Sequence, residues 1–446
     1  MPPASQSCRL LAAALLLAVC ASPLRGFAYE PRQPVNAGVF PVTVRAAEVP
    51  WLIGTQAINL SAFSCFEGKL MPVPVQVDEV NTEGRIASLD PRSRIARDDP
   101  PGILDADDEI VFMLRDTGKP CEQERLERAR GTLTEIRITA PYLATPGILY
   151  LLSGSQPVAP PALYLRYDSV SSQVSTSAYS WGYAADRPFM TDRVVFADLR
   201  GRETQDVMDR FKLRVRVKAV SNLMQLRLNE DEMESDLEGV RAGPIRVTRE
   251  LAVRVKTVPG FTIPAVVTMQ HYERLWRVRV RLRIPGAAAL FVNSLDMSLI
   301  HDFIDLKGLK LATSAVPQGT SIDGRMLDSE RTMEFGSEPW FYIAGQGLQL
   351  MTSIDLEPGL KLKQAVYLVD DPELREPPES VPGGLPSVGY QFLGWENLEA
   401  RWYEFAANIA MLPGLPEGGA SGYYRALRAP MKIETRQIAA MPVSSP

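Results

Sequence analysis

Three stretches of this sequence alternate basic and apolar residues, a spacing that could place a row of cations on one surface. The stretch 276–284 carries four of them, Arg277, Arg279, Arg281 and Arg283. The stretches 211–218 and 251–256 add three more arginines, Arg214, Arg216 and Arg254. A planar guanidinium binds a carboxylate or sulfate group through two parallel hydrogen bonds. The chemistry that these residues suggest is therefore the recognition of an anion.

Two interpretations of the arginines stay open at this point. If the three stretches are neighbouring strands, they form a cationic face that fits an acidic polysaccharide, because like charges side by side need counter-charges. Alternatively, acids from adjacent strands balance the arginines, and the charges only protect an outer surface against edge pairing. The sequence does not show which strands are neighbours.

The two histidines, His271 and His301, are the candidates for acid–base work, together with Tyr272. Elimination at a uronic acid needs a base for the proton next to the carboxylate, a group that neutralises this carboxylate, and an acid for the leaving oxygen. Histidine, tyrosine and arginine can fill these roles. A lone histidine, however, is more often structural. The sequence has no phosphate-binding loop, nucleophile elbow, His-Glu-x-x-His or dinucleotide motif, so these three are the remaining candidates if the protein is an enzyme.

A loop rich in carboxylates offers a candidate calcium site. It contains Asp105, Asp107, Asp108 and Glu109. Hard oxygen ligands at alternate positions suit Ca²⁺. The loop lacks the glycine and the closing glutamate of an EF-hand, and its other interpretation is a solvated turn that precedes a strand. Calcium is the only cofactor that the sequence suggests.

The most distinctive block begins with Met71-Pro-Val-Pro-Val-Gln-Val-Asp-Glu79 and continues, some thirty residues later, with Leu104-Asp-Ala-Asp-Asp-Glu-Ile-Val-Phe-Met-Leu-Arg-Asp116. The region from Met71 to Gly118 resembles secreted bacterial β-rich proteins, some uncharacterised and some associated with polysaccharide breakdown. The resemblance implies export and a β-rich fold.

The elements that position these residues are expected to be strands. The stretches 40–45, 70–77, 109–114, 133–140 and 147–152 are rich in β-branched and aromatic residues at strand length. The alternation in 276–284 has the period of a strand, which buries the apolar side chains on one face and presents the arginines on the other. The stretch from Leu295 to Phe303 fits both a strand and a helix. The acidic run 229–238 is expected to be a solvated loop, with pairing to the basic face or cation binding as the alternatives.

Composition and processing signals limit the class of protein. With 446 residues, 46% hydrophobic residues and a net charge of -5, the chain is predicted to be globular and gives no argument for nucleic-acid binding. Residues 1–28 read as a signal peptide, and lipoprotein anchoring at Cys20 is disfavoured because Val19 precedes it. No later stretch is long and apolar enough to span a membrane.

After removal of residues 1–28 two cysteines remain, Cys65 and Cys121. In an oxidising compartment they are predicted to form one disulfide, with two unpaired thiols as the alternative. A bridge over this separation stabilises the fold by about 4 kcal/mol in the loop-entropy model.

The sequence therefore predicts an exported, periplasmic or extracellular all-β protein with a small N-terminal β domain (29–161) and a larger antiparallel β-sandwich (162–446). The favoured function is non-catalytic binding of an extended ligand, with a carbohydrate or cell-envelope component as partner. The alternatives are a polysaccharide-active enzyme, a lyase before a hydrolase, and a structural envelope or assembly protein.

Overall fold

The computed structural model describes residues 38–88, 93–122, 126, 131–154, 158, 162–219, 224–256, 262–286, 292–374, 377–395 and 399–438. The predicted signal peptide, Cys20 and the domain boundary at residue 161 lie outside these residues, so they stay predictions. In the described part the strands form five sheets, and the pairs of named strands are antiparallel. The all-β class predicted from the sequence is confirmed.

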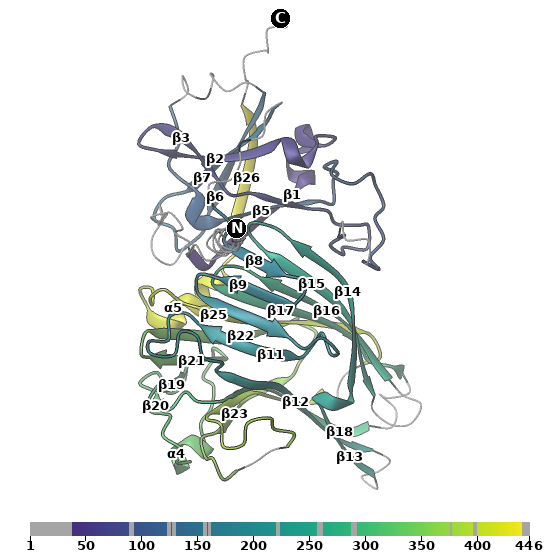
Figure 1. Ribbon diagram of the computed structural model, residues 1–446, viewed down its shortest axis with the longest axis vertical. Coiled ribbons are helices and arrows are strands. Elements are labelled where there is room, and N and C mark those ends of the chain that lie inside the picture. The colour runs from purple at the N-terminus through teal and green to yellow at the C-terminus, as the bar shows by residue number, and fades with distance from the viewer. Residues whose placement is uncertain are drawn as a thin grey trace, which may run out of the picture.

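A nine-stranded sheet forms one layer of the sandwich (Figure 1). In spatial order its strands are β14 (Met233–Ala242), β15 (Val247–Lys256), β16 (Thr262–His271), β17 (Leu275–Arg283), β25 (Trp402–Met411), β22 (Leu348–Leu356), β21 (Trp340–Gly345), β19 (Lys310–Thr313) and β20 (Thr320–Ser321).

Two smaller sheets form the opposite layer. One contains β13 (Met224–Asn229), β12 (Met208–Ala219), β18 (Val292–Phe303), β24 (Ser387–Leu393) and β23 (Lys363–Val369). The other contains β11 (Thr191–Phe196), β10 (Tyr179–Tyr183), β9 (Gln173–Thr176) and β8 (Leu165–Asp168). The stretch from Leu295 to Phe303, which fitted both a strand and a helix, is thus a strand.

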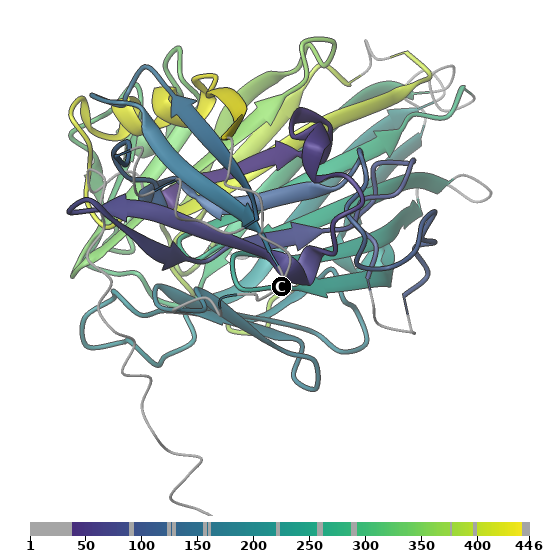
Figure 2. The ribbon, with the colours of Figure 1, turned by 90° about the horizontal axis from the view of Figure 1, so that it is seen from above.

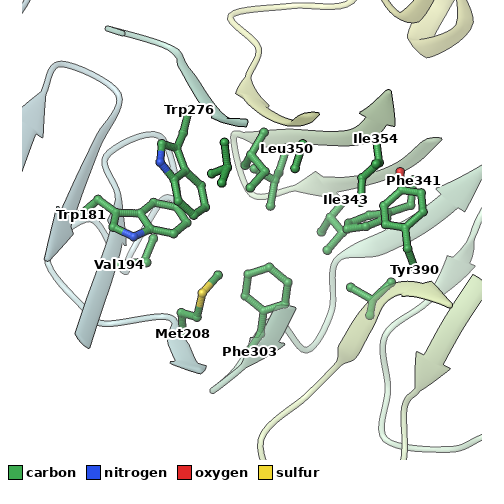
Figure 3. Close-up of a cluster of buried hydrophobic side chains, with 14 of the residues drawn as sticks. Trp181, Val194, Met208, Trp276, Phe303, Phe341, Ile343, Leu350, Ile354 and Tyr390 are labelled. Carbon is green, nitrogen blue, oxygen red and sulfur yellow. The ribbon is translucent and has the colours of Figure 1, made fainter. Parts of the chain in front are cut away.

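The main core lies between these layers, because alternate residues of each strand point inward. Figure 3 shows part of it, with Trp181 and Val194 from the four-stranded sheet facing Trp276 and Leu350 from the nine-stranded sheet. The rings of Trp181 and Trp276 lie 4.0 Å apart between centroids. All labelled residues in this view are buried. On the apolar side of the alternating stretch 276–284, Val278 and Leu282 are buried, and Val280 and Ile284 are partly buried against the same core.

Two further sheets belong to the N-terminal part. The first contains β1 (Pro41–Arg45), β5 (Glu109–Met113) and β4 (Gln76–Asp78). The second contains β26 (Lys432–Ile438), β6 (Thr132–Thr139), β7 (Gly147–Ser153), β2 (Leu60–Phe66) and β3 (Lys69–Val73). The last described strand of the chain, β26, therefore pairs with β6 of the N-terminal part.

The N-terminal part shares a core with one end of the nine-stranded sheet. Val42 and Phe112 of its strands belong to the same buried cluster as Leu275, Met351 and Ala410. Figure 2 shows the purple and blue strands of the N-terminal part lying over the green strands of the large sheet. The helix α5 (Gly419–Arg428) adds Tyr423 to this cluster. The outer face of the large sheet is thus covered at one end.

The short helical elements are α4 (Asp328–Arg331) and the 3-10 turns η2 (Ala46–Glu48), η3 (Pro50–Leu52), η4 (Ala57–Asn59), η5 (Leu114–Asp116) and η6 (Glu230–Glu232). In the described residues no helix is both long and apolar enough to cross a membrane. The predicted disulfide is present: Cys65 and Cys121 are joined by a bond of 2.04 Å, which links β2 to the segment before β6.

The acidic run 229–238 is not the solvated loop expected from the sequence. Asn229 ends β13, and the residues after it form η6 and the first part of β14. Asn229 caps η6, and Glu230 is fully buried, where it pairs with Arg210 and Arg214. The alternative that the run pairs with basic residues is therefore the correct one for Glu230, since a buried carboxylate requires a partner.

Candidate functional site

The basic strands lie in both layers of the sandwich rather than in one sheet. β15 and β17 belong to the nine-stranded sheet, where β16 separates them, and β12 belongs to the opposite layer. Arg214 and Arg216 therefore cannot share a face with the arginines of β17. Arg214 is moreover buried against Glu230. The expectation of one cationic face built from all three strands is wrong, and the face has to be considered on β17 alone.

β17 carries four arginines on the outer face of the nine-stranded sheet. Its side chains alternate, so Val278 and Leu282 point into the core while Arg277, Arg279, Arg281 and Arg283 point outward. We call these four residues the arginine face. The side chains of Arg279 and Arg281 are each 49% exposed. Neighbouring members are about 7 Å apart along the strand, because two residues of an antiparallel strand span that length.

Acids balance the arginine face only in part. Glu404 of β25 lies opposite Arg281, at 4.0 Å from its Nε and 3.5 Å from the Nε of Arg279. Arg277 donates its Nε–H to the amide oxygen of Asn408 at 2.9 Å. Within the described residues, Arg283 has no acidic partner. Among the described residues, Glu404 is thus the single carboxylate within ion-pair distance of this row of four guanidiniums, whereas Arg254 on β15 alone has two, Glu234 and Asp236.

The arginine face begins where the covered part of the sheet ends. Leu275 precedes the four arginines on the same side of β17 and is fully buried in the N-terminal core. Arg277 comes next and is half-buried, and Arg279, Arg281 and Arg283 are exposed. Trp402, which lies opposite Arg283 on β25, is 42% exposed, and its ring is 5.7 Å from the guanidinium of Arg281. The result is an open, charged platform with an aromatic side chain at its far end.

The Pro-Val-Gln-Val-Asp block fixes the N-terminal part beside this platform. The carbonyl oxygen of the Gln76 side chain accepts hydrogen bonds from the backbone N–H groups of Ile245 and Arg246, both at 3.0 Å. Its Nε2 donates to both carboxylate oxygens of Asp78, at 2.8 and 2.9 Å. The block therefore binds the turn between β14 and β15 through these hydrogen bonds. Its role in the structure is docking, which the sequence resemblance did not indicate.

Asp78 is the centre of a buried ion-pair network at this junction. It is 0% exposed and accepts hydrogen bonds from Arg241 Nε at 3.0 Å and Arg246 Nε at 2.6 Å. Arg246 also pairs with Glu109. Asp78 and Glu109 raise the pKa of Arg246, although burial alone would lower it, so Arg246 stays charged. The network joins β4 and β5 to the nine-stranded sheet.

We expect that replacing Gly243 by alanine destabilises this junction. A Cβ at Gly243 would lie 2.2 Å from the Gln76 side chain, whose hydrogen bonds hold it in place. Forced displacement in a packed site costs about 1–3 kcal/mol. Urea unfolding measures the loss. The control is Gly182→Ala on β10, where the nearest atom would be an ordinary 3.6 Å away. Equal stabilities of the two variants would contradict the docking role of Gln76.

The three candidate catalytic residues lie inside the protein. His271 is 0% exposed, and its ring nitrogens contact the hydroxyl groups of Tyr179 at 3.1 Å and Tyr183 at 2.6 Å. Tyr179 donates its own proton to the backbone oxygen of Tyr272 at 2.7 Å. The Tyr179 oxygen therefore accepts a hydrogen bond from Nδ1–H of His271. Nε2 of His271 accepts one from the Tyr183 hydroxyl, so the imidazole ring is neutral. Burial, and then Arg249, hold the pKa of His271 well below its usual value.

His301 and Tyr272 are equally inaccessible. The His301 ring lies among Phe211, Phe303 and Phe341, and burial lowers its pKa to about 3. The Tyr272 hydroxyl lies 3.4 Å from Arg246 Nη1 in the docking network. A substrate cannot reach any of the three in this structure. The prediction that these residues carry acid–base catalysis is corrected accordingly, because each side chain is buried and contacts other side chains of the protein.

The pKa of His301 predicts a pH-dependent stability. Because the folded pKa of about 3 lies below the usual 6.5, the unfolded chain binds the extra proton first, and stability falls as the pH drops from 6.5 toward 3. We expect His301→Phe to remove this loss. Relative to the original protein, it gains about 2–3 kcal/mol on moving from pH 7.5 to pH 4.5, at about 1.4 kcal/mol per pH unit.

Urea unfolding of both proteins at the two pH values measures this gain. Phe303→Leu, at a buried neighbour that does not titrate, is the control and should show the same stability difference at both pH values. A gain that is independent of pH for His301→Phe would contradict a neutral, buried histidine.

The four carboxylates of the predicted calcium loop do not converge. The Asp105 side chain accepts hydrogen bonds from the backbone N–H groups of Asp107 and Asp108, at 2.9 and 3.3 Å. The Asp108 side chain accepts hydrogen bonds from the backbone N–H groups of Val80 and Asp105, both at 3.0 Å. Burial raises the pKa of Asp108 to about 6. Glu109 pairs with Arg246. The prediction that these four acids together form one calcium site is thus corrected. Among the described residues the acids whose oxygens meet are Asp98, Asp99 and Asp105, and calcium binding stays a prediction.

Sequence reasoning missed the residues that complete the platform. Asn408 links Arg277 to Asp355, which accepts its amide N–H at 2.8 Å, and Asp355 in turn pairs with Arg428 of α5. The guanidinium of Arg428 lies 3.5 Å from the ring of Tyr424. The only sequence signal was alternation in β25, which places Trp402, Glu404 and Asn408 on one face.

Comparison with known proteins gives distant structural likenesses. No family model matches the chain, and no curated protein matches it. An alpha-mannosidase from Enterococcus faecalis V583 is similar over 97% of this chain at 8% identity and a TM-score of 0.45. This chain spans about half of that protein, 49% of its length. A GalM/aldose epimerase homologue from C. elegans is similar over 52% of this chain and 95% of its own, at 9% identity and a TM-score of 0.34. A putative kojibiose phosphorylase from human microbiome covers 60% of this chain and 36% of its own, at 9% identity and a TM-score of 0.28.

Proposed function

We propose that this protein is exported and binds an acidic polysaccharide, without catalysis, on the arginine face of its nine-stranded sheet. The observation that carries the proposal is the charge imbalance on β17, where four arginines point outward and, in the part of the chain that the structure describes, one carboxylate, that of Glu404, pairs with Arg279 and Arg281. An unbalanced row of guanidiniums on a sheet repels itself, so an anionic ligand that lies across it is favoured. The disulfide is compatible with export.

The form of the platform suits an extended ligand. Its arginines are exposed beyond Arg277 and recur at every second residue of β17, so successive acidic groups of a polymer can each meet a guanidinium. Trp402 provides an exposed ring against which a sugar can stack. The covered end of the sheet and the docking network hold this surface in place.

The experiment is a binding screen of the purified protein against acidic glycans (polygalacturonate, alginate and heparin) and neutral dextran. Ultraviolet absorbance of unsaturated sugar products is followed in the same samples. We expect binding to acidic glycans only, weakened by salt, with no new absorbance. Failure to bind any acidic glycan would overturn the proposal. Binding accompanied by new absorbance would replace the non-catalytic proposal with the lyase alternative.

A further inference from the structure

A second candidate site is a polar cavity of about 220 Å³ where β11 meets the start of β12 (Figure 1). The two strands are joined here by the N–H of Val207, which donates to the backbone oxygen of Val194 at 2.9 Å. None of the described residues that line the cavity belongs to the nine-stranded sheet, so the cavity is separate from the arginine face. The lining comes from four segments that are distant in the sequence, namely 184–192, 206–210, Ile304 and 380–381.

Three carboxylates line the cavity, those of Asp192, Asp206 and Asp209. Within the described residues none of them has a lysine or arginine at ion-pair distance. Oδ1 of Asp206 accepts the backbone N–H groups of Val194 at 2.9 Å and Met208 at 3.2 Å, and its Oδ2 has no hydrogen-bond partner in the same part of the chain. Burial raises the pKa of Asp206, because water solvates this carboxylate poorly. The acids therefore leave acceptors for a ligand that donates hydrogen bonds.

Asp209 also fixes the loop that forms one wall of the cavity. Its two carboxylate oxygens accept the backbone N–H groups of Ser380 and Val381, both at 3.1 Å. Arg210 donates its Nε–H to the hydroxyl of Ser380, also at 3.1 Å. Because these hydrogen bonds hold the wall in place, a ligand that enters the cavity does not have to order the loop.

Two arginines, Arg187 and Arg210, line the same cavity. Asp231, which is not part of the lining, lies 2.5 Å from Nη1 of Arg187 and 3.6 Å from Nη1 of Arg210. Glu230 pairs with Arg210 as well. Acids outside the cavity thus balance both charges, while the Nη2 group of each arginine has no hydrogen-bond partner among the described residues. The cavity therefore offers hydrogen-bond donors as well as acceptors.

We propose that this cavity binds one neutral sugar ring through its hydroxyl groups. A hydroxyl donates to a carboxylate and accepts from a guanidinium, which is the combination that the walls offer. At roughly 30 Å³ per water molecule, the cavity has the volume of about seven waters, which suits a single ring rather than a polymer. Met190 and Met208 supply adaptable apolar surface for the ring carbons.

The charges of the lining stand against other ligand classes. A uronic acid is disfavoured because its carboxylate would meet three others, and a metal ion or an ammonium group is disfavoured because two guanidiniums line the same space. The ligand is thus distinct in charge from the acidic polysaccharide proposed for the arginine face. The two sites can be tested separately.

The test is saturation-transfer NMR of the unaltered protein at pH 7 with glucose, galactose and mannose, and in parallel with glucosamine. Calorimetric titration then measures the affinity for each sugar that gives a signal, and for calcium chloride. We expect at least one of the three neutral hexoses to bind. Absence of binding by all three, or tighter binding of glucosamine or calcium than of every hexose, would overturn the proposal.

Asp206→Asn keeps the shape of the side chain and removes its charge, so it should weaken binding of the hexose about tenfold or more, as expected for the loss of a charged acceptor. The matched control is Glu203→Gln, an exposed acid of the same connection between β11 and β12 that does not line the cavity. It should change the affinity less than about twofold.

If Asp206→Asn does not fold, Asp192→Asn replaces it. Asp192 is exposed on β11 and has no hydrogen-bond partner within the described residues, so its replacement should leave the fold intact. We expect it to weaken hexose binding about threefold or more. Unchanged affinity in the variant that folds would place the sugar elsewhere and contradict the proposal.

Discussion

Replacing Asp78 by alanine is expected to lower the free energy of unfolding by about 3–5 kcal/mol, because it leaves two arginines at a buried site without their shared carboxylate. Arg246 is 1% exposed and would keep only Glu109, and Arg241 would lose the partner of its Nε. The Gln76 side-chain nitrogen would lose both Asp78 oxygens and keep only the backbone oxygen of Arg246, at 3.2 Å, as an acceptor. For a protein of this size the melting temperature should fall by roughly 5 °C. Calorimetry and urea unfolding measure the two quantities.

The control is Asp236→Ala, which removes an acid that pairs with Arg254 at 2.6 Å on the surface. Both partners are more than a third exposed, so water screens the pair and the loss should be much smaller than for Asp78→Ala. Equal losses for the two variants would show that the Asp78 network does not hold the N-terminal part on the large sheet. The contrast separates buried docking from ordinary surface pairing.

The double replacement Arg279→Ala and Arg281→Ala is expected to weaken binding of acidic polysaccharide at least about a hundredfold. A charge-assisted hydrogen bond contributes roughly 1.5–3 kcal/mol, so the loss of two bidentate groups at the middle of the face corresponds to that factor or more. The fold should be unaffected, because both side chains are half exposed and share only Glu404. Calorimetric titration with polygalacturonate and heparin measures the affinity.

Two single variants serve as controls for the arginine face. Arg216→Ala removes an exposed arginine of the opposite layer, and Arg254→Ala removes one whose charge two acids already balance. Neither should change the affinity more than about twofold, which is the size of a screened surface charge effect. If Arg216→Ala weakens binding as much as the double variant does, the ligand does not lie on β17.

The strands could be predicted from the sequence, because burial on one face of a strand leaves a period of two. This pattern correctly identified β17 and placed Arg277 and Arg279 on its outer face. It also showed that β12 is a strand. It did not show that β12 and β17 lie in opposite layers, since pairing depends on contacts between distant segments. The same limit hid Glu404, which reaches β17 only because β25 pairs with it.

The candidate site was predicted less completely than the fold, for a related reason. The types of Gln76 and Asp78 are visible in the sequence, but their partners at Arg241 and Arg246 come from a turn far along the chain. Histidine likewise has the same appearance in a catalytic cleft and in a core. Only its surroundings, such as the tyrosine hydroxyls at His271, show that it is structural.

The most direct measurement of the central claim is chemical protection of individual arginines. The unaltered protein is treated with phenylglyoxal in the presence and absence of polygalacturonate or heparin, and mass spectrometry follows the modification of each peptide. The account predicts that acidic glycan slows the modification of Arg279, Arg281 and Arg283 and leaves that of Arg216 unchanged. Modification of the β17 arginines at the same rate with and without each glycan would contradict it.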